Sequence, residues 1–300
     1  MSTALLYVTT VLIWGTTWFA LKLQLGVVPI AWSIAYRFWL AAAVLLAWSF
    51  VRHRRLELPP RALWPLVAVQ GLCLFCLNFV CMLNASRWIA SGLVAVCFST
   101  APLWNAFNAR LFRRTPLAPR VLAGSALGVA GLLVLFGTEV SKNLWRTETF
   151  WGMGLAFAGT YCFSVGNSAS SLLQQKGQTP AQTNPWGMLV GAVVISLYAL
   201  ASRQRLRFDA SPVYVGTLVY LTLFGSIVAF HTYLTLVGRL GAERAAYCAV
   251  LFPIVALNIS ARAEGYVWTP ASLLGLLLVI SGNVVVFYRG PWLGKLRSST

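Results

Sequence analysis

The sequence predicts an all-α, polytopic membrane protein whose ten transmembrane helices form two inverted five-helix repeats. The first observation is composition: 59% of the residues are hydrophobic and only 10% are charged, whereas charged residues make up about 25% of a soluble domain. The second is that the apolar residues occur in runs of about 20, the length at which a helix crosses a bilayer. The third is a pattern in the first half that recurs in the second.

The ten apolar runs follow one another with short joins, most of them marked by proline or charge, as at Pro29, Pro116, Pro185 and Pro212. They span residues 4–24, 30–51, 63–83, 91–112, 119–137, 150–174, 184–202, 212–237, 242–262 and 269–289. The polar segment "TEVSKNLWRTET", 138–149, divides them five and five. We therefore predict a first unit over 1–137, a linker over 138–149, and a second unit with a short basic tail over 150–300.

The N-terminal stretch "MSTALLYVTTVLIWG" has no charged n-region and no small-residue cleavage site, so we expect a retained first span rather than a removed signal peptide. The chain contains no GxxxxGK[ST] loop, which excludes ATP hydrolysis by this chain as its power source. All six cysteines lie inside apolar runs and predict buried thiols, not a disulfide framework. Cys73 and Cys76 have metal-ligand spacing, but neither a second pair nor clustered histidines accompany them. We predict no metal and no cofactor.

The net charge of +17 is concentrated in short loops such as "RHRR" at 52–55, "RLFRR" at 110–114 and "RQRLR" at 203–207. Such clusters set the orientation of membrane helices and contact anionic lipid head groups, so membrane lipids are expected partners and nucleic acid is not. Of the 23 Lys and Arg residues, 14 fall on the side of both termini, 8 fall on the other side, and the last is Arg37. The excess predicts that both termini are cytoplasmic.

The two halves match without a gap when residues 97–137 are shifted by 151 positions. The matching pairs are Cys97/Cys248, Pro102/Pro253, Pro119/Pro270, Gly124/Gly275 and Gly131/Gly282. Because each unit holds an odd number of spans, the second unit must enter the membrane from the opposite side. Inverted repeats of this kind are typical of secondary transporters, whose substrate site lies between the halves near the midplane. The competing interpretation is a duplicated scaffold without a cavity.

Several segments carry a family resemblance that covers essentially the whole chain. They are "IWGTTWFALK" (13–22), the arginine in "AYRFWLAAAVLL" (35–46), "NASRWIASGLVAVCFSTAPLW" (84–104) and the second-half pattern "RLGAERAAYCAVLFPIVALN" with "AEGYVWTPASLLGLLLVISGNVV" (239–285). The chain resembles the EamA-type drug/metabolite transporters, and within them the YddG-type exporters of aromatic amino acids. The resemblance implies a ten-helix exporter of small metabolites with a cavity built by helices 1, 3, 4, 6, 8 and 9. We expect it to act as a monomer.

Aromatic side chains on these helices are the first candidate substrate-binding residues, because offset stacking would suit an apolar or aromatic substrate. They are Trp14, Trp18, Phe79, Phe98, Trp104, Tyr161, Phe163 and Tyr247. For each of them the alternative is packing or contact with lipid. Asn78 and Asn167 are amides that either bond across helices or recognise an amino or carboxyl group. His231 is expected to be a neutral hydrogen-bond donor in the pocket, and a proton shuttle is the alternative.

Arg37 lies inside the second apolar run, where a charge costs about 2.5–3.5 kcal/mol even on the mild translocon scale. Three interpretations are open: it reaches the outer interface, it pairs with carbonyls or tyrosines of neighbouring helices, or it binds a substrate carboxylate. Pro102 and Pro253 break helices at repeat-related positions and predict a gating region. Structural roles are favoured for Arg37, and we group it with these prolines as gating or structural residues.

No carboxylate lies inside a span; all six acids fall at or near span ends, namely Glu57, Glu139, Glu148, Asp209, Glu243 and Glu264. Proton-coupled exporters of cations usually need an intramembrane carboxylate, so we predict gradient-driven uniport. The sequence thus predicts an inner-membrane exporter of small metabolites, aromatic or neutral amino acids, working by alternating access and not an enzyme. A lipid-modifying membrane enzyme would need clustered His, Asp or Glu. A proton-coupled drug exporter and a membrane scaffold or receptor without transport are the further alternatives.

Overall fold

The computed structural model describes residues 1–54, 56–113, 119–142, 147–245 and 247–287, and every regular element among them is a helix. The first half contains α1 (Thr3–Leu23), α2 (Ile30–His53), η1 (Arg61–Leu63), α3 (Trp64–Leu72), η2 (Cys73–Leu77), α4 (Asn78–Ala85), α5 (Ser91–Phe98), α6 (Ala101–Arg113) and α7 (Pro119–Lys142). The second contains α8 (Thr147–Gln175), α9 (Pro180–Ala201), α10 (Pro212–Tyr220), η3 (Leu221–Val228), α11 (Ala229–Leu240), α12 (Ala242–Ala245), α13 (Tyr247–Ala263) and α14 (Pro270–Phe287).

The helix ends follow from local sequence. Several helices begin with a hydroxyl residue followed by proline, whose missing N–H is not needed at the first helical position; the pairs are Thr179-Pro180, Ser211-Pro212 and Thr269-Pro270. Gly177, Gly241 and Gly265 follow α8, α11 and α13 with positive φ, a conformation that stops a helix at little cost for glycine. Pro185 does not mark a join as expected: α9 begins at Pro180, where Thr179 and Gln182 cap it, and Pro185 lies within the helix.

Two long helical runs contain π-helical segments. η2 joins α3 to α4, and η3 joins α10 to α11. Such wide turns are frequent at functional sites because they redirect the side chains that follow. In the fourth predicted span, α5 ends at Phe98, a turn covers Ser99 and Thr100, and Pro102 lies in the first turn of α6. Pro253 instead lies inside α13, which continues through it.

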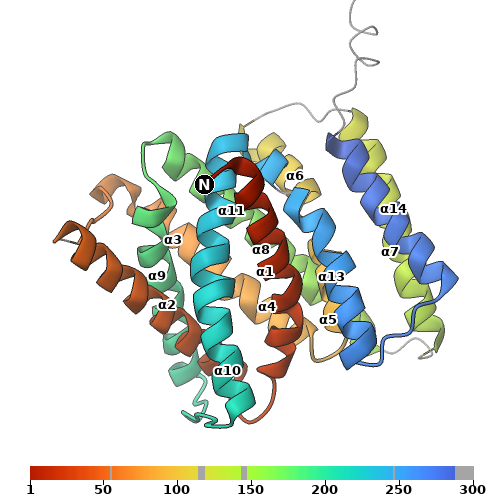
Figure 1. The fold of residues 1–300 in the computed structure, drawn as a ribbon, viewed down its shortest axis with the longest axis horizontal. Helices are drawn as coiled ribbons and strands as arrows, with labels where there is room; N and C mark the ends of the chain where they lie inside the picture. Colours follow the sequence, from red (N-terminus) through yellow and green to blue (C-terminus); the bar gives the residue numbers. More distant parts are fainter. Residues whose placement is uncertain (55, 114–118, 143–146, 246, 288–300) are drawn as a thin grey trace, which may run out of the picture.

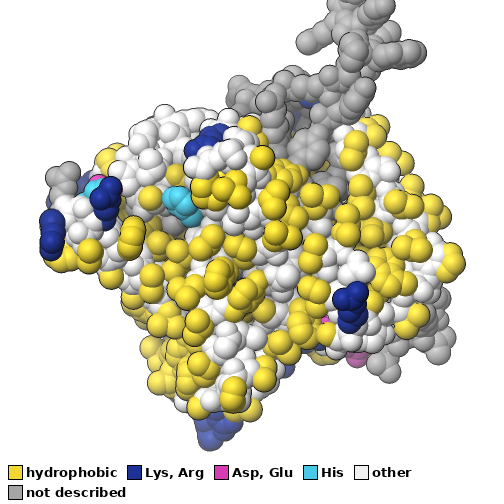
Figure 2. Space-filling model, viewed as in Figure 1, with side chains coloured by type: hydrophobic (Ala, Val, Ile, Leu, Met, Phe, Trp, Pro, Cys, Tyr) yellow, Lys and Arg dark blue, Asp and Glu magenta, His cyan; other side chains and the backbone are white. Residues whose placement is uncertain are grey.

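Five of the described helical segments are long and apolar enough to cross a membrane: Thr3–Leu23, Ile30–His53, Arg61–Ala85, Pro180–Ala201 and Pro212–Leu240. Three shorter apolar helices accompany them, at Ala126–Leu135, Leu251–Ala263 and Pro270–Gly282. Figure 2 shows hydrophobic side chains over the middle of one face, with Lys and Arg toward its edges. This distribution matches a hydrocarbon layer bounded by water and head groups.

The helices form a bundle in which α7 and α14 lie side by side and antiparallel at one edge (Figure 1). Their backbones approach closely at glycine. A Cβ on Gly131 would lie 2.6 Å from the carbonyl oxygen of Gly275, and one on Gly282 would lie 2.5 Å from the carbonyl oxygen of Gly124. Glycines that recur in both halves of the sequence therefore allow the two helices to pack closely, and they face one another across the two halves.

Helices of the two halves also interleave in the rest of the bundle, where α1 packs against α11 and α13, and α2 packs against α9 and η3. We call the end of the bundle where α1 begins the N-terminal end, and the opposite end the far end. The described part of α14 finishes at the N-terminal end, at the same end as the start of α1 (Figure 1). The largest apolar core runs between these helices and holds the residues considered next.

Candidate functional site

An aromatic cluster occupies the centre of the bundle. We use this name for Trp14, Trp18, Phe98, Phe163, Phe230, Tyr233 and Phe252, which come from α1, α5, α8, α11 and α13. Trp14 is its hub: its ring centroid lies 4.9 Å from that of Phe230 and 5.8 Å from that of Phe163, both edge-on. Edge-on and tilted contacts of this kind are the favourable arrangements for aromatic rings.

A small cavity of about 30 Å³ lies against the cluster, lined by residues from both halves: Trp14, Thr17, Trp18, Leu21, Arg37, Asn78, Phe79, Met82, Phe98, Phe163 and Phe230. A cavity of this size holds no more than a few water molecules, so rings and side chains fill most of the middle of the bundle. Six of the predicted substrate-binding residues line it, together with Arg37. Any larger guest has to displace these rings.

Arg37 is only 4% exposed and points into the bundle rather than to its surface. Its Nε donates a hydrogen bond to the Ser226 hydroxyl at 2.7 Å. The guanidinium carbon lies 4.3 Å from the centroid of the Phe79 ring and 5.3 Å from that of Phe38, within the range of cation–π attraction. Its partners are thus a hydroxyl and two rings, in place of the carbonyls, tyrosines or interface that the sequence left open.

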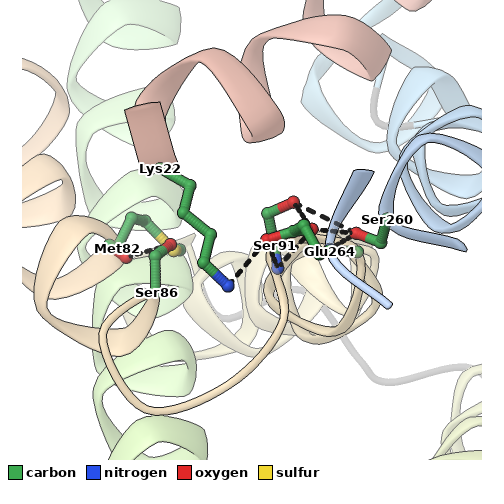
Figure 3. Close-up of polar contacts among 7 residues, drawn as sticks. Lys22, Met82, Ser86, Ser91, Ser260 and Glu264 are labelled. Atoms are coloured by element: carbon green, nitrogen blue, oxygen red, sulfur yellow. Dashed lines mark hydrogen bonds and ion pairs between the residues drawn. The ribbon is translucent and has the colours of Figure 1, made fainter. Parts of the chain in front are cut away.

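At the far end of the bundle lies a cluster of polar side chains around Glu264, which follows α13. The Glu264 carboxylate lies 2.7 Å from Lys22 Nζ at the end of α1. It accepts hydrogen bonds from the Ser91 hydroxyl at 2.5 Å, from the Ser91 backbone N–H, and from Ser260. Figure 3 shows Lys22 reaching across to this cluster from the end of its helix. The carboxylate therefore ties the ends of α1 and α13 to the N-terminus of α5, where a negative charge is favourable.

The cluster makes stability depend on pH. Burial alone would raise the pKa of the Glu264 carboxyl, but hydrogen bonds from Lys22, Ser260 and Ser91 and the charge of Lys22 outweigh it, and the pKa is lowered. A lowered pKa means that the charged cluster stabilises the fold at pH values above the ordinary carboxyl pKa of about 4.3, and that this stabilisation is lost as the pH falls below it.

We expect Glu264→Gln to reduce the free energy of unfolding by about 1–2 kcal/mol near neutral pH, because it removes the charged acceptor of Ser91 and Ser260 and the ion pair with the one-third-exposed Lys22. The difference from wild type stays constant down to about pH 5 and shrinks below about pH 4. Thermal unfolding of the detergent-solubilised protein across pH measures it. Glu57→Gln is the matched control, since the Glu57 carboxylate is 27% exposed and its ion pair, with His53, is long at 3.6 Å. A difference that vanished between pH 7 and 6 would contradict the assignment.

A larger cavity of about 860 Å³ lies at the N-terminal end, between the end of α8, the start of α9 and the end of α11. Its walls carry polar side chains that include Gln174, Gln178, His231 and Arg239. Phe230 lines the central cavity and the next residue, His231, lines this one. The two cavities thus lie against adjacent faces of α11.

Comparison with known proteins identifies the family to which this chain belongs. A family model described as the EamA-like transporter family matches residues 1–137 and 150–288. This chain belongs to the EamA-like transporter family. Among EamA-like relatives, the Escherichia coli protein named "uncharacterized inner membrane transporter YedA" is 29% identical over 92% of this chain and 87% of its own length. Protein PagO of Salmonella typhimurium is 23% identical over 94% of this chain and 91% of its own.

A third EamA-like relative is named a "probable amino-acid metabolite efflux pump" of Escherichia coli; it is 23% identical over 94% of this chain and 93% of its own length. A protein of known crystal structure has the same fold, with a TM-score of 0.71 and 20% identity over 99% of both chains. The resemblance predicted from sequence is confirmed at the level of the family. This EamA-like protein is an integral membrane protein of a transporter family.

The structure separates the sequence-predicted site residues of this EamA-like chain into groups. Trp14, Trp18, Asn78, Phe79, Phe98 and Phe163 meet at the central cavity. The remaining ones lie elsewhere: Trp104 and Tyr161 contact each other at a centroid distance of 5.4 Å, Asn167 donates to the Tyr233 hydroxyl at 3.0 Å, and His231 lines the larger cavity. Pro102 and Pro253 are buried in α6 and α13, and the side chain of Tyr247 lies outside the described residues.

Sequence reasoning missed Phe230, Tyr233 and Phe252 of the cluster, and the cluster around Glu264. Phe230 and Tyr233 are three residues apart and share a helix face that flanks His231, which was a usable signal. Glu264 was placed correctly near a span end, but its side chain is only 4% exposed. Its partners Lys22 and Ser91 are far away in sequence, so no local pattern reveals the contact.

Proposed function

We propose that this chain is a secondary transporter that exports small metabolites, aromatic or neutral amino acids, across the inner membrane by alternating access and uniport. The observation that carries the proposal is the central cavity, where aromatic side chains and a buried cation from both halves of the chain meet. A substrate site between two halves near the middle of the membrane is what an alternating-access carrier requires. The efflux-pump name of one relative supports the substrate class.

In this proposal the chain crosses the membrane ten times as two inverted repeats, with both termini cytoplasmic, and it works as a monomer. The glycine contacts support the inverted repeat. A shift of 151 converts Gly131 into Gly282 and relates Gly275 to Gly124, so the Gly131–Gly275 contact becomes the Gly282–Gly124 contact. An axis that exchanges the two halves requires such an exchange of contacts.

The two ends of the bundle then have different roles. The cavity of about 860 Å³ at the N-terminal end faces the cytoplasm and receives the metabolite. The cluster around Glu264 closes the outer end while the inner end is accessible. Export follows when the rings of the aromatic cluster part, the metabolite occupies the centre, and the outer cluster separates.

Export from loaded proteoliposomes tests the proposal. We expect vesicles containing the purified protein to release phenylalanine, tryptophan and tyrosine down their gradients faster than serine or lysine, and to do so without an imposed pH gradient. Empty vesicles and vesicles with a heat-denatured protein are the controls. Equal release of all five amino acids would overturn the aromatic assignment, and release that stopped without a pH gradient would overturn uniport.

A further inference from the structure

Three buried polar atoms on the central cavity have no hydrogen-bond partner among the described residues. They are Nη1 of Arg37 on α2, Nε1 of Trp18 on α1 and Oδ1 of Asn78 on α4. The three side chains are 4%, 6% and 4% exposed. Two of the atoms are donors and one is an acceptor. Buried polar groups are normally paired, because an unpaired one loses its hydration without compensation.

Of these three side chains only Arg37 is charged, and little in its surroundings compensates the charge. Among the described residues it forms no ion pair, and its contacts are the Ser226 hydroxyl and the rings of Phe79 and Phe38. A ring face offsets only a small part of the cost of moving a guanidinium into an apolar interior. An anion would compensate it, and the planar guanidinium fits a carboxylate better than any other common anion except phosphate.

The rest of the cavity wall is apolar. Trp14, Phe98, Phe163 and Phe230 line it beside the polar atoms. A ligand that complements the whole cavity wall therefore carries an anionic hydrogen-bond acceptor, a hydrogen-bond donor close to it, and an apolar side chain. A phosphate ester matches the cation, but its several oxygens would leave Asn78 Oδ1 without a donor and would lie against rings.

We propose that Arg37 and Trp18 bind the carboxylate of the exported metabolite, and that Asn78 accepts a hydrogen bond from its amino group. This deepens the proposed function and rests on it: the substrate class becomes α-amino acids with apolar or aromatic side chains. Arg37 repels amines that lack a carboxylate, so the same residue excludes cationic compounds. The rings move apart to admit the substrate, since the closed cavity holds only about 30 Å³.

Competition in the wild-type protein tests the proposal without any substitution. The proteoliposomes take up radiolabelled phenylalanine by counterflow, and three competitors are compared: phenylalanine, 3-phenylpropionate, which lacks the amino group, and phenethylamine, which lacks the carboxylate. We expect 3-phenylpropionate to compete, less well than phenylalanine, and phenethylamine to be at least about tenfold weaker than 3-phenylpropionate. Phenethylamine that competed as well as phenylalanine would overturn the proposal and leave the exporter function intact.

Single substitutions at the site provide the second test. Trp18→Phe keeps a ring and removes the N–H, and Asn78→Leu keeps the size and removes the acceptor. We expect Trp18→Phe to weaken competition by 3-phenylpropionate and by phenylalanine alike, about tenfold. Asn78→Leu should weaken competition by phenylalanine alone, also about tenfold. Arg37→Gln should abolish competition by both. Trp48→Phe and Arg52→Gln, at exposed positions of α2, are the matched controls.

Ligand-induced thermal stabilisation of the detergent-solubilised protein distinguishes carboxylate binding at the site from transport across the membrane. Stabilisation of wild type by phenylalanine and 3-phenylpropionate, lost in Arg37→Gln, would support the carboxylate site even if vesicle transport failed. Transport of phenylalanine that Trp18→Phe and Arg37→Gln left unchanged would refute the site while the exporter function stood. The absence of both binding and transport for every amino acid would overturn the proposed function and this inference together.

Discussion

Gly131→Ala is expected to lower the thermal stability of the protein by the equivalent of about 3 kcal/mol, the upper part of the range for overpacking a close contact. The added Cβ would lie 2.6 Å from the Gly275 carbonyl oxygen and 2.7 Å from the Val279 backbone nitrogen. Both are backbone atoms of α14 and cannot rotate away. The two helices therefore have to separate, and every contact along their seam weakens.

Gly128→Ala is the matched control, one turn earlier on the same helix. Its Cβ would meet only Leu103 Cδ1, at 4.0 Å, and alanine is the better helix former. Melting curves of the three proteins in the same detergent measure the effect, with wild type and Gly128→Ala unfolding together and Gly131→Ala well below them. Similar melting temperatures for both variants would show that α7 and α14 do not approach as closely as described.

The second large effect is expected at Trp14, where alanine should cost about 3–5 kcal/mol, the range for removing a large buried aromatic side chain. Trp14 contacts the rings of Phe163, Phe230, Tyr233 and Phe252. Its Nε1 also donates to the Gly225 carbonyl oxygen at 3.2 Å. The substitution removes the hub of the cluster and leaves a cavity that its neighbours only partly fill.

Thermal unfolding compares Trp14→Ala with Trp48→Ala, in which the replaced indole is 68% exposed. We expect the exposed substitution to change stability little, because its ring contacts lipid or detergent in both states. Trp14→Phe serves as a milder probe that keeps ring contacts and loses the hydrogen bond to Gly225, and it should fall between wild type and Trp14→Ala. An equal loss in Trp14→Ala and Trp48→Ala would contradict the central role of the aromatic cluster.

Much of the fold could be predicted from the sequence because the relevant signals are local. A run of apolar residues long enough to cross the membrane, and a proline or a charge at a join, each depend on a few neighbouring residues. The glycines of α7 and α14 could be matched from their repeat positions, but that these two helices approach closely at them is seen only in the structure. Pro185 was misread because a proline near the start of a helix and a proline in a loop have the same local signature.

The candidate site was only partly predictable. Trp14, Trp18 and Phe98 were named on helices that the family resemblance assigns to a cavity, and the structure brings them to one cavity. Trp104 and Tyr161 satisfied the same criterion and lie elsewhere. In helices that are apolar on every side, periodicity carries little information about which face turns inward. Whether an aromatic side chain points into the bundle or toward the lipid is then decided by packing between helices.

The sequence by itself indicated that this chain folds in a membrane as apolar helices, and that a residue pattern of the first half recurs in the second, since both depend on composition and spacing along the chain. Only the tertiary structure decided that Arg37 is buried with no carboxylate partner among the described residues, and that Glu264 joins Lys22 and Ser91. Those partners come from segments far apart in sequence. Their contact depends on how the two halves pack against each other, and no local interaction encodes that arrangement.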